Sequence, residues 1–349
     1  MQTADLTAIL TTLQSRKDLS REQMRQFVAW LLSGTADQPT ITACLLTLSD
    51  KGETVDELVG AAEALRDSML PVRSPNRPLL DTCGTGGDGA KTFNISTAAA
   101  IAIAACGVAV AKHGNRKITS STGSADVLAE LGINLEASPA VVETCLNHLG
   151  ICFCFAPHFH PAMRHVGPAR REIPKPTIFN RLGPLANPAS ANHQVLGVGA
   201  EHLQRPMAEA LQRLGSHRSL VVRGEDGVDE ISLTTSTRVL EVTPQSIVEY
   251  QWSPEDFGLP RSGRDALFAD DPVASAACIR DVLDGKLGAC RDVVVINAAA
   301  GLWVAGVHDD LRVCARRVQE ALDAGHAKRL LEQLGQATHA SDVQPDVKQ

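Results

Sequence analysis

The sequence predicts an α/β protein in which a small N-terminal α-helical domain precedes a larger α/β domain with a mainly parallel central sheet covered by helices. Two observations lead to this prediction. Apolar residues recur at helical spacing through the first seventy positions, and short apolar strand patterns alternate with helical patterns from residue 79 onward. Strands that are apolar on both faces are typical of a parallel sheet buried between layers of helices.

Residues 1–70 are expected to form the small helical domain. Segments 20–23 and 54–57 each match the capping box, in which a hydroxyl residue is followed three positions later by Gln or Glu. Apolar stripes at helical spacing follow both segments. Residues 71–78 contain three prolines and are expected to be a linker, and residues 161–188, rich in proline and arginine, are expected to complete the helical domain in part.

Residues 79–160 and 189–338 are expected to form the α/β domain that would bind the ligand. The expected strands cover residues 79–81, 108–111, 150–155, 193–198 and 219–222. The expected helices cover residues 97–105 and 125–131, followed in the C-terminal part by 276–283, 293–305 and 311–334. Residues 339–349 are expected to be a polar tail.

Composition and charge exclude several classes of partner. The chain has 349 residues, 44% of them hydrophobic, which allows two domains and a substantial core. A net charge of −7 opposes recognition of nucleic acid or an anionic membrane through a basic surface. The longest apolar run, residues 98–111, is too short to span a bilayer, and the first residues do not resemble a signal peptide. Nine cysteines without a C-x-x-C pair indicate free thiols and a cytoplasmic location.

The strand at 79–81 runs into a glycine loop, residues 84–89, with the sequence Gly-Thr-Gly-Gly-Asp-Gly. Such strand-to-helix junctions direct backbone N–H groups at an anion. The loop matches the G-x-G-x-x-G pattern of dinucleotide sites, but the next strand ends in Lys112 and His113, where such a site needs an acidic residue for the ribose. Asp88 would repel a bare pyrophosphate, unless it bonds a hydroxyl or metal ions accompany the ligand.

A second junction of the same kind follows the strand at 108–111. Residues 112–116, Lys-His-Gly-Asn-Arg, precede the hydroxyl cluster 120–124, Ser-Ser-Thr-Gly-Ser. A solvated basic turn or simple helix capping would explain part of this segment, but the carboxyl end of a buried parallel strand is where α/β sheets bind ligands. Two such junctions in tandem predict a ligand with phosphate at both ends.

A pair of carboxylates, Asp229 and Glu230, follows the strand expected at 219–222. An acidic surface turn explains this pair equally well when it is considered alone. Adjacent carboxylates at a strand end are also what Mg²⁺ requires when it brings substrate phosphates with it. Histidines 158, 160 and 165 lack a metal spacing, so structural or hydrogen-bonding roles are expected for them.

These residues together resemble the motifs of the anthranilate phosphoribosyltransferases, tryptophan-pathway enzymes with the nucleoside phosphorylase type of fold. The resemblance covers nearly all of the chain outside its termini. Besides the two phosphate loops, it includes residues 51–54 (Lys-Gly-Glu-Thr), 60–62 (Gly-Ala-Ala), 155–161 (Phe-Ala-Pro-His-Phe-His-Pro), 177–188, 226–232 and 297–300 (Asn-Ala-Ala-Ala).

The resemblance implies a Mg²⁺-dependent pentosyltransferase that moves the 5-phosphoribosyl group of phosphoribosyl pyrophosphate (PRPP) to the amine of anthranilate and releases pyrophosphate. It implies no dedicated catalytic acid or base, and a homodimer formed through the helical domain. The residues it implies for PRPP are Gly84, Thr85, Gly86, Gly87, Asp88, Thr92, Asn94, Ser96, Thr97, Lys112, Ser120, Ser121 and Ser124. Those for anthranilate are Gly84, His113, Asn115 and Arg170, and those for the metal are Ser96, Asp229 and Glu230.

The chain departs from the family pattern at two positions near the expected acceptor side. Pro174 stands where relatives commonly have glycine, and Met163 where some carry an aromatic residue. Two other functions stay open on the residues alone. A pyrimidine nucleoside phosphorylase-like enzyme would carry Lys-x-Ser-Gly-Arg in its second loop, unlike residues 112–116. A non-catalytic nucleic-acid-binding relative would need a basic surface, which the net charge of −7 opposes.

Overall fold

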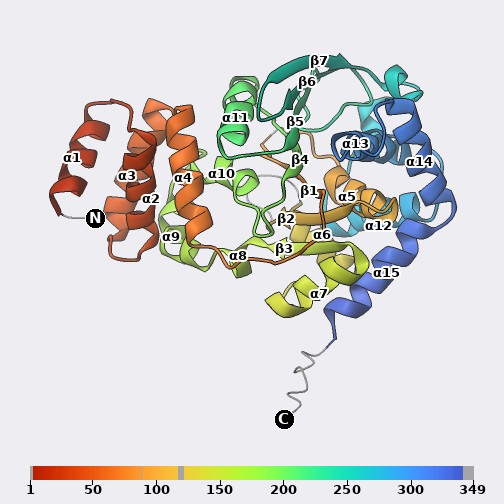
Figure 1. Cartoon of the computed structure of the whole chain (residues 1–349), viewed down its shortest axis with the longest axis horizontal. Helices are drawn as coiled ribbons and strands as arrows, with labels where there is room; N and C mark the ends of the chain where they lie inside the picture. Colours follow the sequence, from red (N-terminus) through yellow and green to blue (C-terminus); the bar gives the residue numbers. More distant parts are fainter. Residues whose placement is uncertain (1–2, 88, 117–121, 341–349) are drawn as a thin grey trace, which may run out of the picture.

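The computed structural model describes residues 3–87, 89–116 and 122–340. Its four N-terminal helices gather at one end of the molecule, beside a larger α/β part (Figure 1). They are α1 (Thr3–Gln14), α2 (Arg21–Leu32), α3 (Gln38–Lys51) and α4 (Val55–Asp67). Short helices from the middle of the chain join them, with α9 on α3 and α10 on α4. These short elements are α8 (Ala156–Phe159), η1 (Pro161–His165), α9 (Gly167–Glu172), α10 (Phe179–Leu182) and η2 (Gly183–Leu185).

Side-chain caps explain where two of the N-terminal helices begin. The Ser20 hydroxyl accepts the Gln23 N–H, and the Gln23 side chain accepts the Ser20 N–H in return. Thr54 and Glu57 form the same pair at the start of α4. Each pair satisfies N–H groups that have no partner within the helix. Both predicted capping boxes are therefore confirmed.

Seven strands form one sheet, in the order β3-β2-β1-β4-β5-β6-β7. The strands are β1 (Leu79–Gly84), β2 (Ala109–Gly114), β3 (Ile151–Phe155), β4 (His193–Gly197), β5 (Arg218–Gly224), β6 (Thr237–Val242) and β7 (Ile247–Trp252). Neighbours from β3 to β5 are parallel, which confirms the mainly parallel sheet, whereas β6 and β7 run antiparallel. The sequence pattern does not predict this last hairpin, because β7 is largely exposed and lacks the continuous apolar run of the buried strands.

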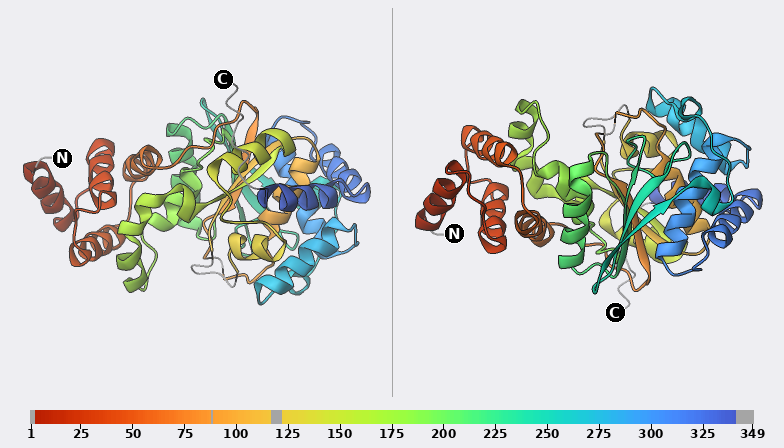
Figure 2. Two further views of the ribbon diagram at one scale, coloured as in Figure 1. Left: turned by 90° about the horizontal axis from the view of Figure 1, so that it is seen from below. Right: turned by 90° about the horizontal axis from the view of Figure 1, so that it is seen from above.

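Helices cover both faces of the sheet, as the sequence predicts (Figure 2). On one face α5 packs on β1 and β2, and α13 packs on β4 and β5. On the other face α11 packs on β5 and β6 and also contacts α4. The helices of the α/β part are α5 (Ile95–Ala105), α6 (Ser124–Glu130), α7 (Pro139–Leu149), α11 (Glu201–Arg213), α12 (Pro272–Leu283), α13 (Ala289–Val304), α14 (Leu311–Asp323) and α15 (His326–Thr338). No helix among the described residues has both the length and the apolar character needed to cross a membrane.

Along β4, β5 and β6, the two faces of the sheet belong to two separate cores. Leu220 and Val222 of β5 face the core that contains α5 and α13. Val221 of the same strand, with Leu196 of β4, joins a core that continues through α11 into the N-terminal helices. Successive side chains on a strand point to opposite faces, so β4, β5 and β6 each serve both cores, whereas the buried apolar side chains of β2 and β3 belong to the first core alone. A continuous apolar core thus fastens the helical part to one face of the sheet.

The helical part contains a fully buried carboxylate, Glu57, in the first turn of α4. Its oxygens accept the N–H groups of Leu19 and Thr54, both at 2.9 Å, and Lys51 Nζ at 2.8 Å. Lys51 in turn is paired with Asp18 at 2.7 Å. These bonds join the loop before α2 to the end of α3 and the start of α4. Glu57 therefore determines how three helices meet.

Replacing Glu57 with alanine should lower the free energy of unfolding by about 3–5 kcal/mol, because the change removes the acceptor of a buried ion pair. Urea unfolding followed by circular dichroism measures this loss. Asp67→Ala is the matched control, since it removes the exposed partner of Arg25 in the same group of helices. The control should leave the unfolding midpoint nearly unchanged. Equal shifts for the two variants would contradict the structural role assigned to Glu57.

Candidate active site

A cavity of about 610 Å³ opens at the carboxyl ends of β1 and β2. β1 lies between β2 and β4. The chain after β1 continues to one side of the sheet, toward β2, and the chain after β4 continues to the other side, toward β5. Open parallel sheets bind ligands at such a switch point. The predicted site residues that line this cavity are Gly84, Thr85, Gly86, Gly87, Thr92, Asn94, Ser96, Lys112, His113, Asn115, Ser124, Asp229 and Glu230.

Five predicted residues stand apart from this set. Thr97 is buried behind the cavity in α5, and its hydroxyl has no hydrogen-bond partner among the described residues. Arg170 lies on α9 and does not line the cavity. Asp88, Ser120 and Ser121 lie outside the described residues.

The glycine loop after β1 is shaped by the close approach of Asp229. A Cβ on Gly84 would overlap the Asp229 carboxylate, so this position accepts only glycine without displacing it. Gly86 and Gly87 have φ values of 66° and 81°, a region that side-chain-bearing residues rarely adopt. The Gly86 N–H donates to Asp229 Oδ2 at 2.9 Å. The loop therefore presents backbone N–H groups and a carboxylate to the same space.

Asn94, immediately before α5, connects the two predicted phosphate loops. Its Oδ1 accepts the Thr122 hydroxyl at 2.7 Å and the Ser275 hydroxyl at 2.9 Å. Ser275 Oγ also accepts the Asn94 N–H at 2.9 Å. These bonds fix the start of α5, whose first N–H groups favour an anion. Thr122 lines the cavity and belongs to the hydroxyl cluster 120–124 that the sequence singles out, although it is not among the residues assigned individually to PRPP.

Lys112 places a buried cation beneath the first loop. Its Nζ donates to the Thr82 carbonyl and to Ser96 Oγ, the latter at 3.2 Å. Burial lowers the pKa of Lys112, and the carboxylate of Asp81 is the largest influence in the opposite direction. An anion bound in the cavity would add a further partner for this ammonium group.

Asp229 and Glu230 reach the cavity from the segment after β5. Glu230 Oε1 accepts the Ser96 N–H at 3.2 Å, opposite the bond between Asp229 and Gly86. Asn297 of α13 fixes this segment through two hydrogen bonds. Its side chain accepts the Ile231 N–H at 2.9 Å and donates to the Ile231 carbonyl at 3.0 Å. The Asn-Ala-Ala-Ala motif noted in the sequence thus contributes a support for the carboxylates.

The donor set around these carboxylates fits magnesium. Two carboxylates and the Ser96 hydroxyl are hard oxygen donors at one end of the cavity. Within residues 3–87, 89–116 and 122–340, no group of three or more His, Cys, Asp or Glu side chains could hold a metal ion by itself. Mg²⁺ commonly keeps several waters and binds through one or two carboxylates together with substrate phosphates. The protein would therefore supply part of the coordination and a phosphorylated ligand the rest.

The cavity is also lined by a neutral histidine, His113. Its Nδ1 donates to the Gly183 carbonyl at 2.9 Å, and its Nε2 is buried without a partner among the described residues. Burial lowers the pKa of His113 to about 4, so the ring is uncharged at neutral pH. His160 lies against it with ring centroids 5.0 Å apart, and burial lowers the pKa of His160 to about 3. Sequence reasoning gave His160 no site role, and its spacing from other histidines carries no signal of this contact.

Arg170 is a mostly buried cation on the helical side. Its guanidinium lies over the Phe179 ring, 5.6 Å from the centroid, and it has no acidic partner among the described residues. Burial lowers its pKa from the usual value. Met163 packs partly buried against the core of the helical part, while Pro174 is exposed between α9 and α10. Neither of these two departures from the family pattern lines the cavity.

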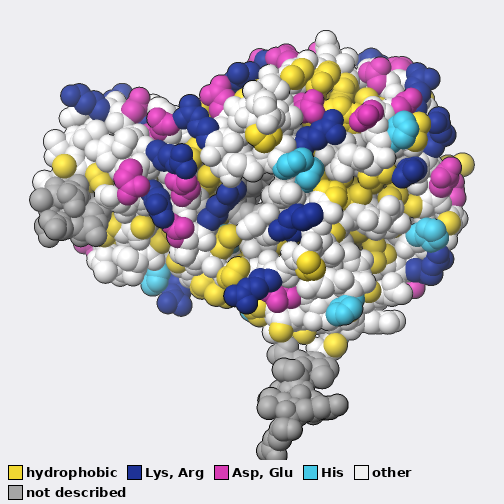
Figure 3. Space-filling model, viewed as in Figure 1, with side chains coloured by type: hydrophobic (Ala, Val, Ile, Leu, Met, Phe, Trp, Pro, Cys, Tyr) yellow, Lys and Arg dark blue, Asp and Glu magenta, His cyan; other side chains and the backbone are white. Residues whose placement is uncertain are grey.

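Several charged residues of the cavity were not predicted. Lys91 and Arg116 bring cations to its rim and Asp270 brings a carboxylate. Arg116 is exposed and pairs with Asp126 at 3.2 Å. Outside the cavity, charges of both signs are interspersed over the face shown in Figure 3, rather than gathered into a basic stripe. This face gives no support to a nucleic-acid-binding function.

Comparisons with known proteins agree with this geometry. Residues 7–69 match the family described as "Glycosyl transferase family, helical bundle domain", and residues 76–328 match "Glycosyl transferase family, a/b domain". An anthranilate phosphoribosyltransferase of Rhodopirellula baltica is 47% identical over 94% of this chain and 96% of its own length. An anthranilate phosphoribosyltransferase of Desulfosudis oleivorans is 45% identical over 95% of this chain and 98% of its own length.

Solved structures give the same relationship. The anthranilate phosphoribosyltransferase of Thermus thermophilus superposes with a TM-score of 0.90 at 42% identity, over 95% of this chain and 99% of its own. The Saccharomyces cerevisiae enzyme, solved in complex with PRPP and Mg, gives a TM-score of 0.88 at 27% identity. The superposition covers 97% of this chain and 98% of the yeast chain. A close match in sequence and fold along nearly the whole chain, with the glycine loop and the paired carboxylates in one cavity, shows that the chain belongs to the anthranilate phosphoribosyltransferase family.

Proposed function

We propose that this chain transfers the 5-phosphoribosyl group of PRPP to the amine of anthranilate and releases pyrophosphate, the second step of the tryptophan branch. One observation carries the assignment. Asp229 and Glu230 bond the N–H groups of Gly86 and Ser96 in a cavity that His113 also lines. This geometry supports a metal-dependent diphosphate site next to an uncharged acceptor site, in a chain 47% identical to a named anthranilate phosphoribosyltransferase.

The donor end suits a diphosphate leaving group. The N–H groups of the glycine loop and of the first turn of α5 can donate to phosphate oxygens. Lys112, joined to Ser96, supplies positive charge from below. When bound by Ser96, Asp229 and Glu230, Mg²⁺ would neutralise negative charge on the pyrophosphate. The assigned ribose and 5-phosphate contacts are Asn94, Ser120, Ser121 and Ser124, with Thr85, Gly87, Asp88 and Thr92 nearer the pyrophosphate and its metal. Thr97 is not assigned a contact, because it is buried and does not line the cavity.

The acceptor end suits a small aromatic acid. We assign the carboxylate of anthranilate to Arg170, whose planar guanidinium binds carboxylates well and has no acidic partner among the described residues. Asn115 and Gly84 line the cavity beside His113. The neutral His113 ring already donates through Nδ1, which leaves Nε2 as a hydrogen-bond acceptor for an amine N–H. Together these groups would orient the amine toward the ribose.

The expected chemistry is displacement of pyrophosphate from the anomeric carbon by the amine nitrogen. The transition state would be oxocarbenium-like, with negative charge growing on the leaving group, so fixed N–H donors and cations stabilise it more than the ground state. An aromatic amine is neutral at physiological pH and needs no dedicated base before it attacks. Holding the two substrates in line supplies much of the remaining acceleration.

We further propose a homodimer formed through the helical part and a cytoplasmic location. Trp30 and Leu46, on α2 and α3, are only partly buried in the single chain and would be covered further by a second copy. All nine cysteines are free thiols, which suits a reducing compartment.

Purified protein supplied with PRPP, anthranilate and Mg²⁺ should consume anthranilate, which is measured as a loss of its fluorescence. Omission of PRPP or of Mg²⁺ should abolish the loss, because both are required for the leaving group. Absence of turnover with anthranilate, in protein that still binds PRPP by calorimetry, would contradict the acceptor assigned to this chain.

Replacing Asp229 with asparagine and Glu230 with glutamine should reduce kcat by roughly 100-fold or more and raise the Mg²⁺ concentration needed for half-maximal rate, because charge stabilisation of the leaving group is lost. Steady-state rates across a Mg²⁺ titration measure both effects. Glu225→Gln is the matched control, since Glu225 is exposed in the same segment and does not line the cavity. A normal Mg²⁺ dependence in the double variant would remove these carboxylates from the metal site.

Replacing Arg170 with alanine should raise the KM for anthranilate by roughly 10- to 100-fold, the loss of a charge-assisted hydrogen bond of about 1.5–3 kcal/mol. The KM for PRPP should stay unchanged. Arg171→Ala tests the neighbouring arginine, which is exposed, and should behave as the wild type. A larger effect of Arg170→Ala on PRPP than on anthranilate would show that Arg170 serves the donor instead.

A further inference from the structure

The short helix η2 is bonded by three different parts of the fold through three successive carbonyls. The Gly183 carbonyl accepts His113 Nδ1 at 2.9 Å, the Pro184 carbonyl accepts Gln194 Nε2 at 2.8 Å, and the Leu185 carbonyl accepts Arg66 Nε at 2.7 Å. These donors belong to β2, β4 and α4. The acceptor end of the cavity, the centre of the sheet and the helical part therefore meet at one turn of backbone.

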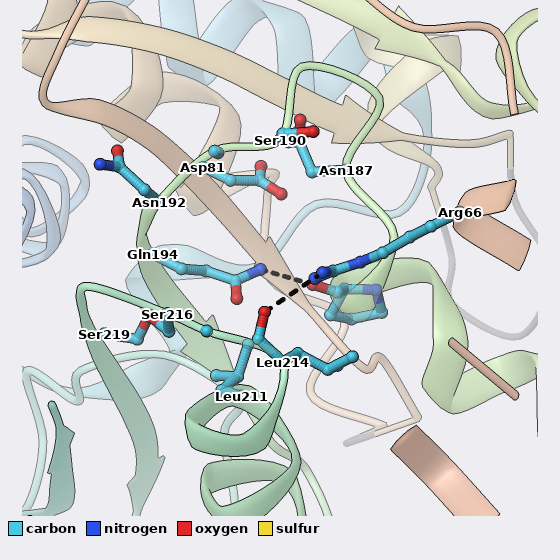
Figure 4. Close-up of a pocket in the computed structure, with 13 residues that line it drawn as sticks. Arg66, Asp81, Asn187, Ser190, Asn192, Gln194, Leu211, Leu214, Ser216 and Ser219 are labelled. Carbon is cyan, nitrogen blue, oxygen red and sulfur yellow. Dashed lines mark hydrogen bonds between the residues drawn. The ribbon is translucent and has the colours of Figure 1, made fainter. Parts of the chain in front are cut away.

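A second cavity, of about 200 Å³, lies against this turn. Figure 4 shows Arg66 and Gln194 entering it from opposite sides, with Leu214 at the end of α11 below them. Arg66 also donates to the Leu214 carbonyl at 3.4 Å. The residues that line this cavity are largely polar. The side chains of Pro184 and Leu185 are buried, and on the cavity side Gln194 and Arg66 bond the carbonyls of these two residues.

Arg66 is unusual because it is largely buried and bonds only carbonyls. Among the described residues the nearest acidic influence on it is Glu63, and Glu63 forms its own ion pair with Arg21. Burial lowers the pKa of Arg66. Burying an unpaired charge opposes folding, and carbonyl hydrogen bonds offset that cost only in part. The contribution of Arg66 to stability therefore does not explain why an arginine stands here. Its hydrogen bond to the Leu185 carbonyl of η2 gives a reason.

The Gly183 carbonyl in turn determines the state of the His113 ring. A carbonyl can only accept, so Nδ1 must carry the proton and Nε2 must hold the lone pair. Nε2 is buried and has no hydrogen-bond partner among the described residues. No second hydrogen bond from those residues therefore stabilises this tautomer. If the carbonyl moved away, the ring would lose the one bond that selects its tautomer and orientation.

We propose that Arg66 and Gln194 are positioning residues for the acceptor, which hold η2 so that the Gly183 carbonyl keeps His113 in the Nδ1–H tautomer with Nε2 ready to accept from the amine. This inference rests on the proposed phosphoribosyl transfer. It adds a link between the helical part, through Arg66, and the orientation of a group at the acceptor end. None of the three bonds to η2 involves the glycine loop, but Gln194 Nε2 also donates to Cys83 Sγ at 3.1 Å, directly before that loop, so Arg66→Ala is the variant that best separates the acceptor from the donor.

Steady-state kinetics of Arg66→Ala and Gln194→Met test the proposal. For both variants kcat/KM for anthranilate should fall by roughly 10- to 100-fold, as expected when a reacting group is misplaced. The dissociation constant of PRPP, measured by calorimetry, should stay at the wild-type value. Arg66→Lys should recover part of the loss, since an ammonium group can still donate to a carbonyl. If Arg66→Ala does not fold, Gln194→Met carries the test alone.

Arg213→Ala is the matched control. It removes the ion pair between Arg213 and Asp56, which also joins α11 to α4, but it leaves every bond to η2 in place. It should lower kcat/KM far less than Arg66→Ala does. If Arg213→Ala has the same effect, or if Arg66→Ala and Gln194→Met weaken PRPP and anthranilate alike, the two residues act only through stability and the inference is overturned.

Nitrogen-15 NMR of histidine-labelled protein gives a readout that does not depend on turnover. The His113 signals, assigned by their loss in His113→Gln, should report the Nδ1–H tautomer in the wild type and a mixture of tautomers in Arg66→Ala and Gln194→Met. If the tautomer is unchanged in these two variants, the inference is overturned even if their activity falls. Failure of the wild type to use anthranilate would instead refute the proposed function, and the NMR result would still decide whether η2 orients His113.

Discussion

The close approach of one loop to the ends of two neighbouring strands constrains the whole site. A Cβ on Gly197, at the end of β4, would overlap the Asp229 carbonyl, and one on Gly84, at the end of β1, would overlap its carboxylate. Because both strand ends carry glycine, the segment after β5 can lie across them and place Asp229 and Glu230 over the glycine loop. Asn297 supports this segment from α13. Backbone packing at the ends of β1 and β4 thus sets the positions of Asp229 and Glu230.

Charge is distributed differently at the two ends of the cavity. Beside the glycine loop, the buried cation Lys112 is influenced by three carboxylates, Asp81, Asp229 and Glu230, so Mg²⁺ would be needed to offset their negative charge when a diphosphate binds. At the acceptor end, burial keeps His113 and His160 neutral. A low density of charge there would suit the aromatic ring of the proposed acceptor, whose carboxylate we assign to Arg170 on α9, outside the cavity wall.

The sequence predicted much of the fold and part of the site, for identifiable reasons. Capping boxes and helical apolar stripes are local signals, and both appear where expected at α2 and α4. The glycine loop and Lys112, near the end of β2, are local signals as well, because strand ends determine where such residues lie. The hairpin of β6 and β7 was missed, since an exposed edge strand needs no continuous apolar run. His160, Lys91 and Asp270 reach the site through contacts that no spacing in the chain encodes.

What the sequence determined by itself is therefore the class of ligand: two glycine- and hydroxyl-rich junctions, a lysine in place of an acidic residue, and a pair of carboxylates. Each is a property of a few consecutive residues at a strand end. Only the tertiary structure decided how these parts face one another, and that Thr97 and Arg170 lie off the cavity wall. It also decided that three carbonyls of η2 connect β2, β4 and α4. Arg66 and Leu185, for example, are more than one hundred positions apart in the sequence. Tertiary packing, and not a local sequence pattern, brings such residues into contact.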